Sequence, residues 1–147
     1  MPALNVVAEI EIAAEPTDVA GVMFDPAREP EWMAAVTSVE VIDPAIRPGA
    51  RVKHSASVMG FAVGWTTTVE SFHFPHMLTL AIAEGSFNGT LQYEVGRRGT
   101  GSVARVAISG DAKLPALVPA AMVTGKAREA LDGYLARLKA LVETPVA

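Results

Sequence analysis

The chain has 147 residues, of which 50% are hydrophobic and 19% charged, and its formal net charge is −4. This composition predicts one globular domain over residues 1–147 and excludes an intrinsically disordered chain. Phosphate binding needs clustered lysine and arginine, so the acidic balance argues against a nucleic-acid partner. Because the sequence contains no cysteine, disulfides and thiolate chemistry are excluded.

Two segments bear on cellular location. Residues 1–12 lack a basic start followed by an apolar block, so they do not predict a signal peptide. The longest apolar run, LPALVPAAMV at residues 114–123, is about half as long as the roughly 20 residues that a membrane-spanning helix needs. We therefore expect a cytoplasmic protein without a membrane span.

The first 24 residues predict a strand followed by a short helix. Residues 15–24 (EPTDVAGVMF) predict a helix that begins at Pro16 or Thr17. Residues 3–14 (ALNVVAEIEIAA) alternate between apolar and polar side chains, which is typical of a strand with one face in water. The core-facing residues of this strand are predicted to be Val6, Ala8, Ile10 and Ile12.

The stretch DPAREPEW, residues 25–32, predicts a second short helix with a kink. Asp25 can cap this helix at Pro26, and Pro30 disfavours helix at the residue before it, so the chain bends before Trp32. We interpret Glu29 and Glu31 as a solvated edge of this bent segment. The alternative is a catalytic carboxylate pair.

Six further strands and a long helix complete the chain. Short turns separate the strand candidates at residues 36–43, 50–59, 62–73, 77–83, 87–95 and 102–110, which predicts antiparallel neighbours. Residues 114–143 predict an amphipathic helix, with one face made by Leu117, Ala121, Thr124, Ala127, Leu131, Leu135, Leu138 and Val142.

This order of elements resembles the helix-grip fold of the SRPBCC superfamily, which includes START lipid-transfer domains, pollen-allergen-like proteins and polyketide cyclase/dehydrase families. The resemblance rests on residues 9–32, Gly49 before a strand, residues 69–80 (VESFHFPHMLTL) and the last helix. It implies an α+β fold with a curved seven-stranded antiparallel sheet, two short helices after the first strand, and the long C-terminal helix over the sheet. Trp32 then becomes a buried plug at one end of the sheet, or alternatively a ligand contact.

A curved sheet wrapped around one helix leaves a gap unless large side chains fill it. The helix has small residues such as Ala120 and Gly125 in its first half and leucines in its second, which predicts a cavity open at one end. Alternatively, the small residues let the helix lie closer to the sheet. Strand alternation predicts the inward-facing residues Val52, His54, Ala56, Val58, Trp65, Thr67, Val69, Leu78, Leu80, Ile82, Phe87, Leu91, Tyr93, Val95, Ala104, Val106 and Ile108.

Two inward-facing residues are candidates for chemistry. His54 can act as an acid or base, or it is a hydrogen-bonded core histidine. Tyr93 can donate to a ligand carbonyl, or it finds a protein partner. We expect neither a cofactor nor a metal site, since His73 and His76 have no adjacent acid. The predicted ligand-binding residues are Trp32, His54, Trp65, Thr67, Leu80, Phe87, Leu91, Tyr93, Ala121 and Thr124.

Three functions follow as hypotheses. The first is binding of an apolar small molecule, such as a lipid, polyketide or isoprenoid-like compound. The second, implied by the resemblance, is a polyketide cyclase/dehydratase-like enzyme in which His54 and Tyr93 act on a bound ketone. The third is a chaperone-activator-like interaction module, which would need an apolar patch on the outer face of the sheet. We expect a monomer or a homodimer.

Overall fold

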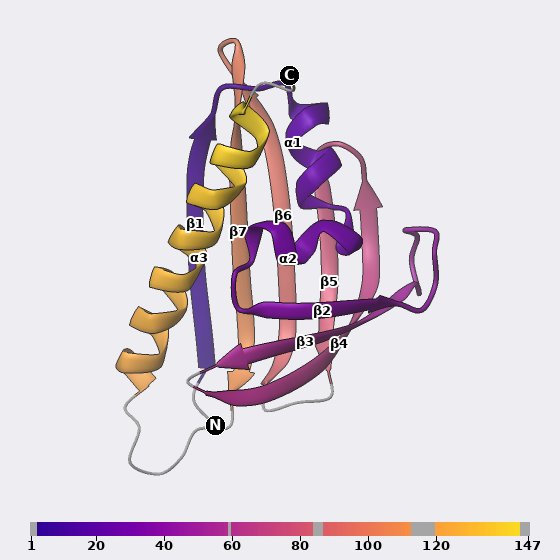
Figure 1. The fold of residues 1–147 in the computed structure, drawn as a ribbon, viewed down its shortest axis with the longest axis vertical. Helices are drawn as coiled ribbons and strands as arrows, with labels where there is room; N and C mark the ends of the chain where they lie inside the picture. The colour runs from indigo at the N-terminus through magenta and orange to yellow at the C-terminus, as the bar shows by residue number, and fades with distance from the viewer. Residues whose placement is uncertain (1–2, 59, 84–86, 113–119, 145–147) are drawn as a thin grey trace.

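The computed structural model describes residues 3–58, 60–83, 87–112 and 120–144 (Figure 1). Seven antiparallel strands form one sheet in the order β1-β7-β6-β5-β4-β3-β2. The strands are β1 Ala3–Ile12, β2 Val36–Val41, β3 Arg51–Val58, β4 Phe61–His73, β5 Met77–Ala83, β6 Phe87–Arg98 and β7 Gly101–Ala112. The helical segments are α1 Pro16–Met23, the 3-10 turn η1 Pro26–Arg28, α2 Glu29–Trp32 and α3 Ala120–Glu143.

The sheet is strongly curved, and this curvature creates its concave inner face. In Figure 1, β2 and β3 run across the molecule, while β5, β6 and β7 run along its length. The strand β4 turns from one direction to the other, and its register with β5 shifts between Val69 and Ser71. Such an irregularity bends a strand and increases its twist. The arrangement confirms the predicted helix-grip fold.

The segments α1, η1 and α2, here called the plug, cover one end of the concave face (Figure 1). Pro16 begins α1, and the Asp25 side chain accepts a hydrogen bond from the Ala27 backbone N–H at 3.0 Å, as predicted. The predicted break at Pro30 is wrong. Helix α2 begins one residue earlier, so Pro30 occupies its first turn, where a missing N–H has no intrahelical partner to lose.

The inner face of the sheet is the one that sequence alternation predicts. Every predicted inward-facing residue is buried or half-buried, except Val58, whose side chain lies outside the described part of the structure. The core also includes Trp32 from the plug, which is 1% exposed, as expected of a buried plug residue. The outer face of β1 carries Glu9 and Glu11, which are both exposed.

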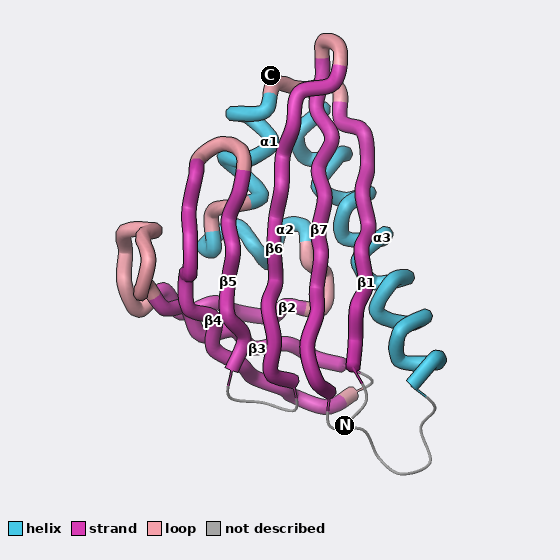
Figure 2. Tube along the Cα trace, turned by 180° about the vertical axis from the view of Figure 1, so that it is seen from behind, coloured by secondary structure: helices cyan, strands magenta, loops and turns pink. Residues whose placement is uncertain are grey.

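Helix α3 packs on the inner side of the sheet beside β1 (Figures 1 and 2). Leu135 and Leu138 are fully buried there, and Leu131 is 8% exposed. Residues 114–119, predicted as the start of this helix and including Leu117, lie outside the described residues. Within the described ranges, no helix is both long enough and apolar enough to cross a membrane.

Leu135→Ala tests how α3 is anchored. We expect this substitution to lower the free energy of unfolding by about 2–5 kcal/mol, because it removes a fully buried side chain and leaves a cavity. The matched control is Met122→Ala on the same helix, where the side chain is 52% exposed and the change should stay within about 0.5 kcal/mol. Urea denaturation followed by circular dichroism measures both. Equal losses would contradict the packing described.

Candidate functional site

An apolar cleft of about 360 Å³ lies between the inner face of the sheet and α3. Four strands, the helix and the residue that follows α2 contribute to it. Its volume falls in the range typical of small-molecule pockets, which are mostly apolar. The described lining residues are Met33, Val63, Gly64, Trp65, Ile82, Phe87, Leu91, Ile108, Leu131 and Tyr134.

The exposure of inner-face residues along β4 shows where this cleft opens. Alternate residues of a strand share a face, so Phe61, Val63, Trp65 and Thr67 all point to the concave side. The exposed fraction is 73% at Phe61 and 39% at Val63, but only 2% at Thr67. The concave face is therefore closed at the plug and uncovered toward the β3–β4 hairpin.

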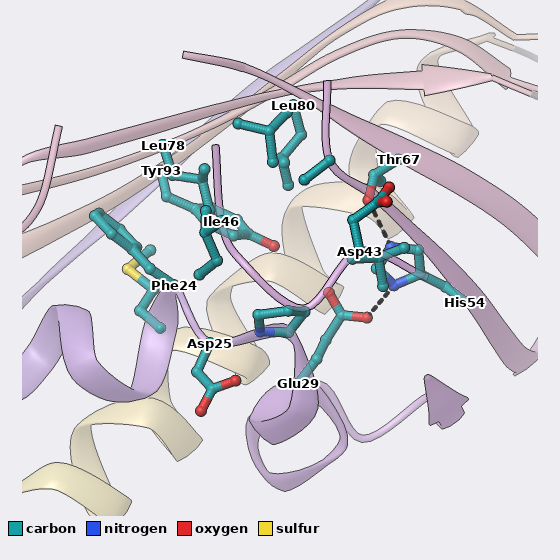
Figure 3. A pocket seen from close by; sticks show the side chains of 15 residues that line it. Phe24, Asp25, Glu29, Asp43, Ile46, His54, Thr67, Leu78, Leu80 and Tyr93 are labelled. Carbon is teal, nitrogen blue, oxygen red and sulfur yellow. Dashed lines mark hydrogen bonds and ion pairs between the residues drawn. The ribbon is translucent and has the colours of Figure 1, made fainter. Parts of the chain in front are cut away.

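A second, smaller space, here called the polar cavity, lies under the plug (Figure 3). Its volume is about 30 Å³, which is room for about two water molecules. Most of its wall is apolar, but it also contains carboxylate, imidazole and hydroxyl groups. Its lining residues are Met23, Phe24, Asp25, Pro26, Glu29, Asp43, Ile46, Ala50, Val52, His54, Thr67, Val69, Leu78, Leu80 and Tyr93.

Three side chains from three elements form a hydrogen-bonded chain in the wall of the polar cavity (Figure 3). Nδ1 of His54 on β3 contacts Oε2 of Glu29 on α2, and Nε2 lies 2.8 Å from Oγ1 of Thr67 on β4. An ionised carboxylate only accepts, so Nδ1 carries the hydrogen. In the neutral imidazole, Nε2 therefore accepts from the Thr67 hydroxyl. The three residues are 2–6% exposed, so the Glu29 charge depends on this partner inside the core.

The interpretation of Glu29 as a solvated residue is wrong, whereas that of Glu31 is confirmed. Glu29 and Trp32 are three residues apart, so they share the inward face of the four-residue helix α2. Glu31 points outward and forms an ion pair with Arg28 at 2.9 Å. The hydrogen bond from Arg28 is the main reason that the pKa of the Glu31 carboxyl is lowered.

The His54 and Trp65 rings lie between the polar cavity and the apolar cleft. The two residues face each other across β3 and β4 in the strand register. Their rings stack with centroids 5.1 Å apart and an interplanar angle of 4°. Since His54 lines the polar cavity and Trp65 lines the apolar cleft, the stacked pair forms part of the wall between them.

Tyr93 reaches the polar cavity from β6 and is 2% exposed. Its ring stacks on Phe24 and meets Trp32 edge-on, with centroids 6.2 and 5.7 Å apart. Burial, and secondly the nearby Glu29 carboxylate, raise the pKa of the Tyr93 hydroxyl well above 10, so it stays protonated. The described residues provide no hydrogen-bond partner for this hydroxyl.

The predicted ligand-binding residues fall into separate groups. Three line the apolar cleft, namely Trp65, Phe87 and Leu91. Four line the polar cavity, namely His54, Thr67, Leu80 and Tyr93. Trp32 and Thr124 are not among the described lining residues of either space, and the Ala121 side chain lies outside the described part.

Sequence analysis missed several lining residues, among them Glu29, Met33, Val63 and Tyr134. Among the described side chains of α3, Leu131 and Tyr134 line the apolar cleft, whereas the small residues Thr124 and Ala127 do not. Burial raises the pKa of the Tyr134 hydroxyl, although a hydrogen bond with the Ala35 backbone opposes this effect. The described residues contain no cluster of three or more histidine, aspartate or glutamate side chains that could hold a metal ion.

Comparisons with known proteins agree with this architecture. The model of a family described as "Polyketide cyclase / dehydrase and lipid transport" matches residues 3–143. A START superfamily protein from Mycobacterium smegmatis has a similar structure, with a TM-score of 0.82, 20% identity, and coverage of 95% of this chain and 97% of that one. These matches confirm the predicted resemblance to the SRPBCC superfamily. A search of curated proteins found no match.

Two other solved structures share the fold at lower identity. Ginseng major latex-like protein 151 from Panax ginseng has a TM-score of 0.76 and 13% identity, with coverage of 97% of this chain and 99% of that one. The di-domain ARO/CYC BexL from the BE-7585A biosynthetic pathway has a TM-score of 0.78 and 17% identity, with coverage of 98% of this chain and 51% of that one.

Glu29 and Glu31 provide a matched test of the buried pair. We expect Glu29→Ala to lower the free energy of unfolding by about 2–5 kcal/mol, because His54 loses its buried partner. Glu31→Ala should cost less than about 1 kcal/mol, because its ion pair with Arg28 is solvent-exposed. Urea denaturation followed by tryptophan fluorescence measures the difference. Similar losses in the two variants would show that the buried pair does not hold α2 in place.

Proposed function

This chain belongs to the polyketide cyclase / dehydrase and lipid transport family, and we propose that it binds an apolar small molecule in the cleft between the sheet and α3. The observation that carries the proposal is the largely apolar lining of that 360 Å³ space. The family match over residues 3–143 also supports the prediction of a single domain.

The chemistry of the lining supports a particular ligand class. Trp65, Phe87 and Leu131 offer aromatic and aliphatic surface, and burying apolar area contributes about 25 cal/mol per Å². The described lining contains no charged side chain, so a charged group on the enclosed part of a ligand would lose its hydration without a partner. We therefore favour a lipid, a polyketide or an isoprenoid-like compound.

The uncovered end of the concave face provides a route of entry. Phe61 and Val63 extend the apolar surface of Trp65 along β4 toward the hairpin. An apolar ligand that approaches from this side stays in contact with apolar side chains until it reaches the cleft. This continuity supports uptake at the β3–β4 end.

The enzyme hypothesis has less support from the geometry. His54 and Tyr93, its candidate catalytic residues, line the polar cavity on the other side of the His54–Trp65 stack from the apolar cleft. A substrate in the cleft would have to displace part of that wall to reach either side chain. The interaction-module hypothesis also has little support, because polar side chains such as Arg105 and Glu94, which form an ion pair at 3.2 Å, occupy the outer face.

Neighbouring residues on opposite faces of β4 test ligand binding. We expect Val63→Asp to weaken binding of the neutral dye N-phenyl-1-naphthylamine at least about tenfold, because it places a charge in the apolar cleft. Ala62→Asp, which adds the same charge on the other face, should leave the affinity unchanged. Dye fluorescence measures binding.

Two results would contradict the proposal. One is the absence of saturable dye binding by the unmodified protein. The other is an equal loss of affinity in the Val63→Asp and Ala62→Asp variants, which would mean that the dye does not bind in the cleft. Circular dichroism of both variants provides the control for folding.

A further inference from the structure

The polar cavity contains two polar groups that face its interior from opposite walls. Figure 3 shows the Tyr93 hydroxyl and the Glu29 carboxylate both directed into this space. One carboxylate oxygen of Glu29 is engaged by His54, whereas the Tyr93 hydroxyl has no partner among the described residues. A buried hydroxyl without a partner costs free energy, so this arrangement calls for a group between the two.

The chemistry of the two groups defines what fits between them. The Tyr93 hydroxyl is protonated and can donate, while the Glu29 carboxylate accepts. A ligand oxygen that accepts from Tyr93 and also donates to Glu29 must carry a hydrogen. A hydroxyl group satisfies both partners, as does a water molecule, which a bound alcohol would have to displace. A ketone cannot donate to Glu29, and an ammonium group gives the Tyr93 hydrogen no acceptor.

The other carboxylates around the cavity are already engaged. Asp25 accepts the Ala27 backbone N–H at 3.0 Å. Asp43 accepts the Arg51 backbone N–H at 2.9 Å and lies 3.7 Å from the Arg51 guanidinium. A site for a cation would need these charges free, so the acidic residues do not point to one.

We propose that the polar cavity is a binding site for the hydroxyl group of an alcohol, held between the Tyr93 hydroxyl as donor and the Glu29 carboxylate as acceptor. Its volume of about 30 Å³ fits the hydroxyl and the carbon that bears it, so that any further carbons extend beyond this space. Phe24, Leu78 and Leu80 provide the apolar contacts for the enclosed carbon. The site is separate from the apolar cleft, so this inference does not depend on the proposed function.

We infer that access to the site lies between η1 and the segment that joins β2 to β3, where the lining residues are partly exposed. Pro26 and Ile46 line this side of the cavity and are half-buried, as are Asp25 and Asp43. The bound hydroxyl belongs either to a short free alcohol or to the end of a longer chain that leaves through this opening. The chemistry recognised is the same in both cases.

An NMR titration with ethanol and acetonitrile tests the inference. The two probes have the same number of heavy atoms, but only ethanol can both accept and donate a hydrogen bond. The reporter is the indole N–H resonance of Trp32, whose ring contacts Tyr93. We expect a saturable shift with ethanol and at least threefold weaker binding of acetonitrile. No saturable shift with ethanol, or equal binding of the two probes, would overturn the proposal.

Variants connect the effect to the two side chains. Tyr93→Phe should weaken ethanol binding by about threefold to tenfold, because it removes only the donor. Glu29→Gln should also weaken it, whereas Glu31→Gln on the outer side of the same helix should not. If Glu29→Gln fails to fold, the Tyr93→Phe result decides. Unchanged ethanol affinity in Tyr93→Phe would overturn the proposal.

Two further measurements are needed. One distinguishes a short free alcohol from the end of a longer chain, and the other distinguishes the hydroxyl site from the apolar cleft. The first is a titration with 1-hexanol, followed by the Trp32 resonance while N-phenyl-1-naphthylamine occupies the apolar cleft. If the site binds the end of a longer chain, 1-hexanol should bind more tightly than ethanol. Weaker binding of 1-hexanol supports a short free alcohol. Tyr93→Phe should bind the dye normally, so failure of the hydroxyl site and failure of the apolar cleft are distinguishable.

Discussion

The buried contact between Glu29 and His54 is the constraint on which the interior depends. A carboxylate removed from water needs a partner, and this one finds its partner on a strand 25 positions further along the chain. The contact fixes the rotation of α2 against β3. That rotation also turns Trp32 into the core, where its ring meets Tyr93. A short helix with little surface of its own is thereby held in one orientation.

The same contact helps to divide the concave side of the sheet into two spaces. His54 is held on one side by Glu29 and at its other ring nitrogen by Thr67, and Trp65 stacks on its face. The plug closes the space behind this wall and leaves a small cavity with polar groups. In front of the wall, apolar side chains of α3 and the sheet surround a larger cleft. The curvature of the sheet creates the space on its concave side, and His54 helps to divide that space in two.

This division bears on how members of such a family can differ in function. The family description includes both catalysis and lipid transport. In this chain the groups capable of acid–base chemistry lie behind the wall, and the apolar enclosure lies in front of it. Binding in the cleft therefore requires no chemistry from His54 or Tyr93. The polar cavity offers recognition of a different kind, based on paired hydrogen bonds rather than on apolar area.

The sequence by itself determined the order of elements and, through its resemblance to the SRPBCC superfamily, the helix-grip fold. It also determined the inward-facing residues of each strand, because alternation along a strand is a local property. It did not show that Glu29 is buried while Glu31 is exposed. Which side of the four-residue helix α2 faces the core depends on its contact with His54 on the distant strand β3. The sequence also placed His54 and Trp65 on the same face without assigning them to different spaces. Only the tertiary structure decided these points, because the bend of β4 and the position of the plug arise from contacts between residues far apart in the chain.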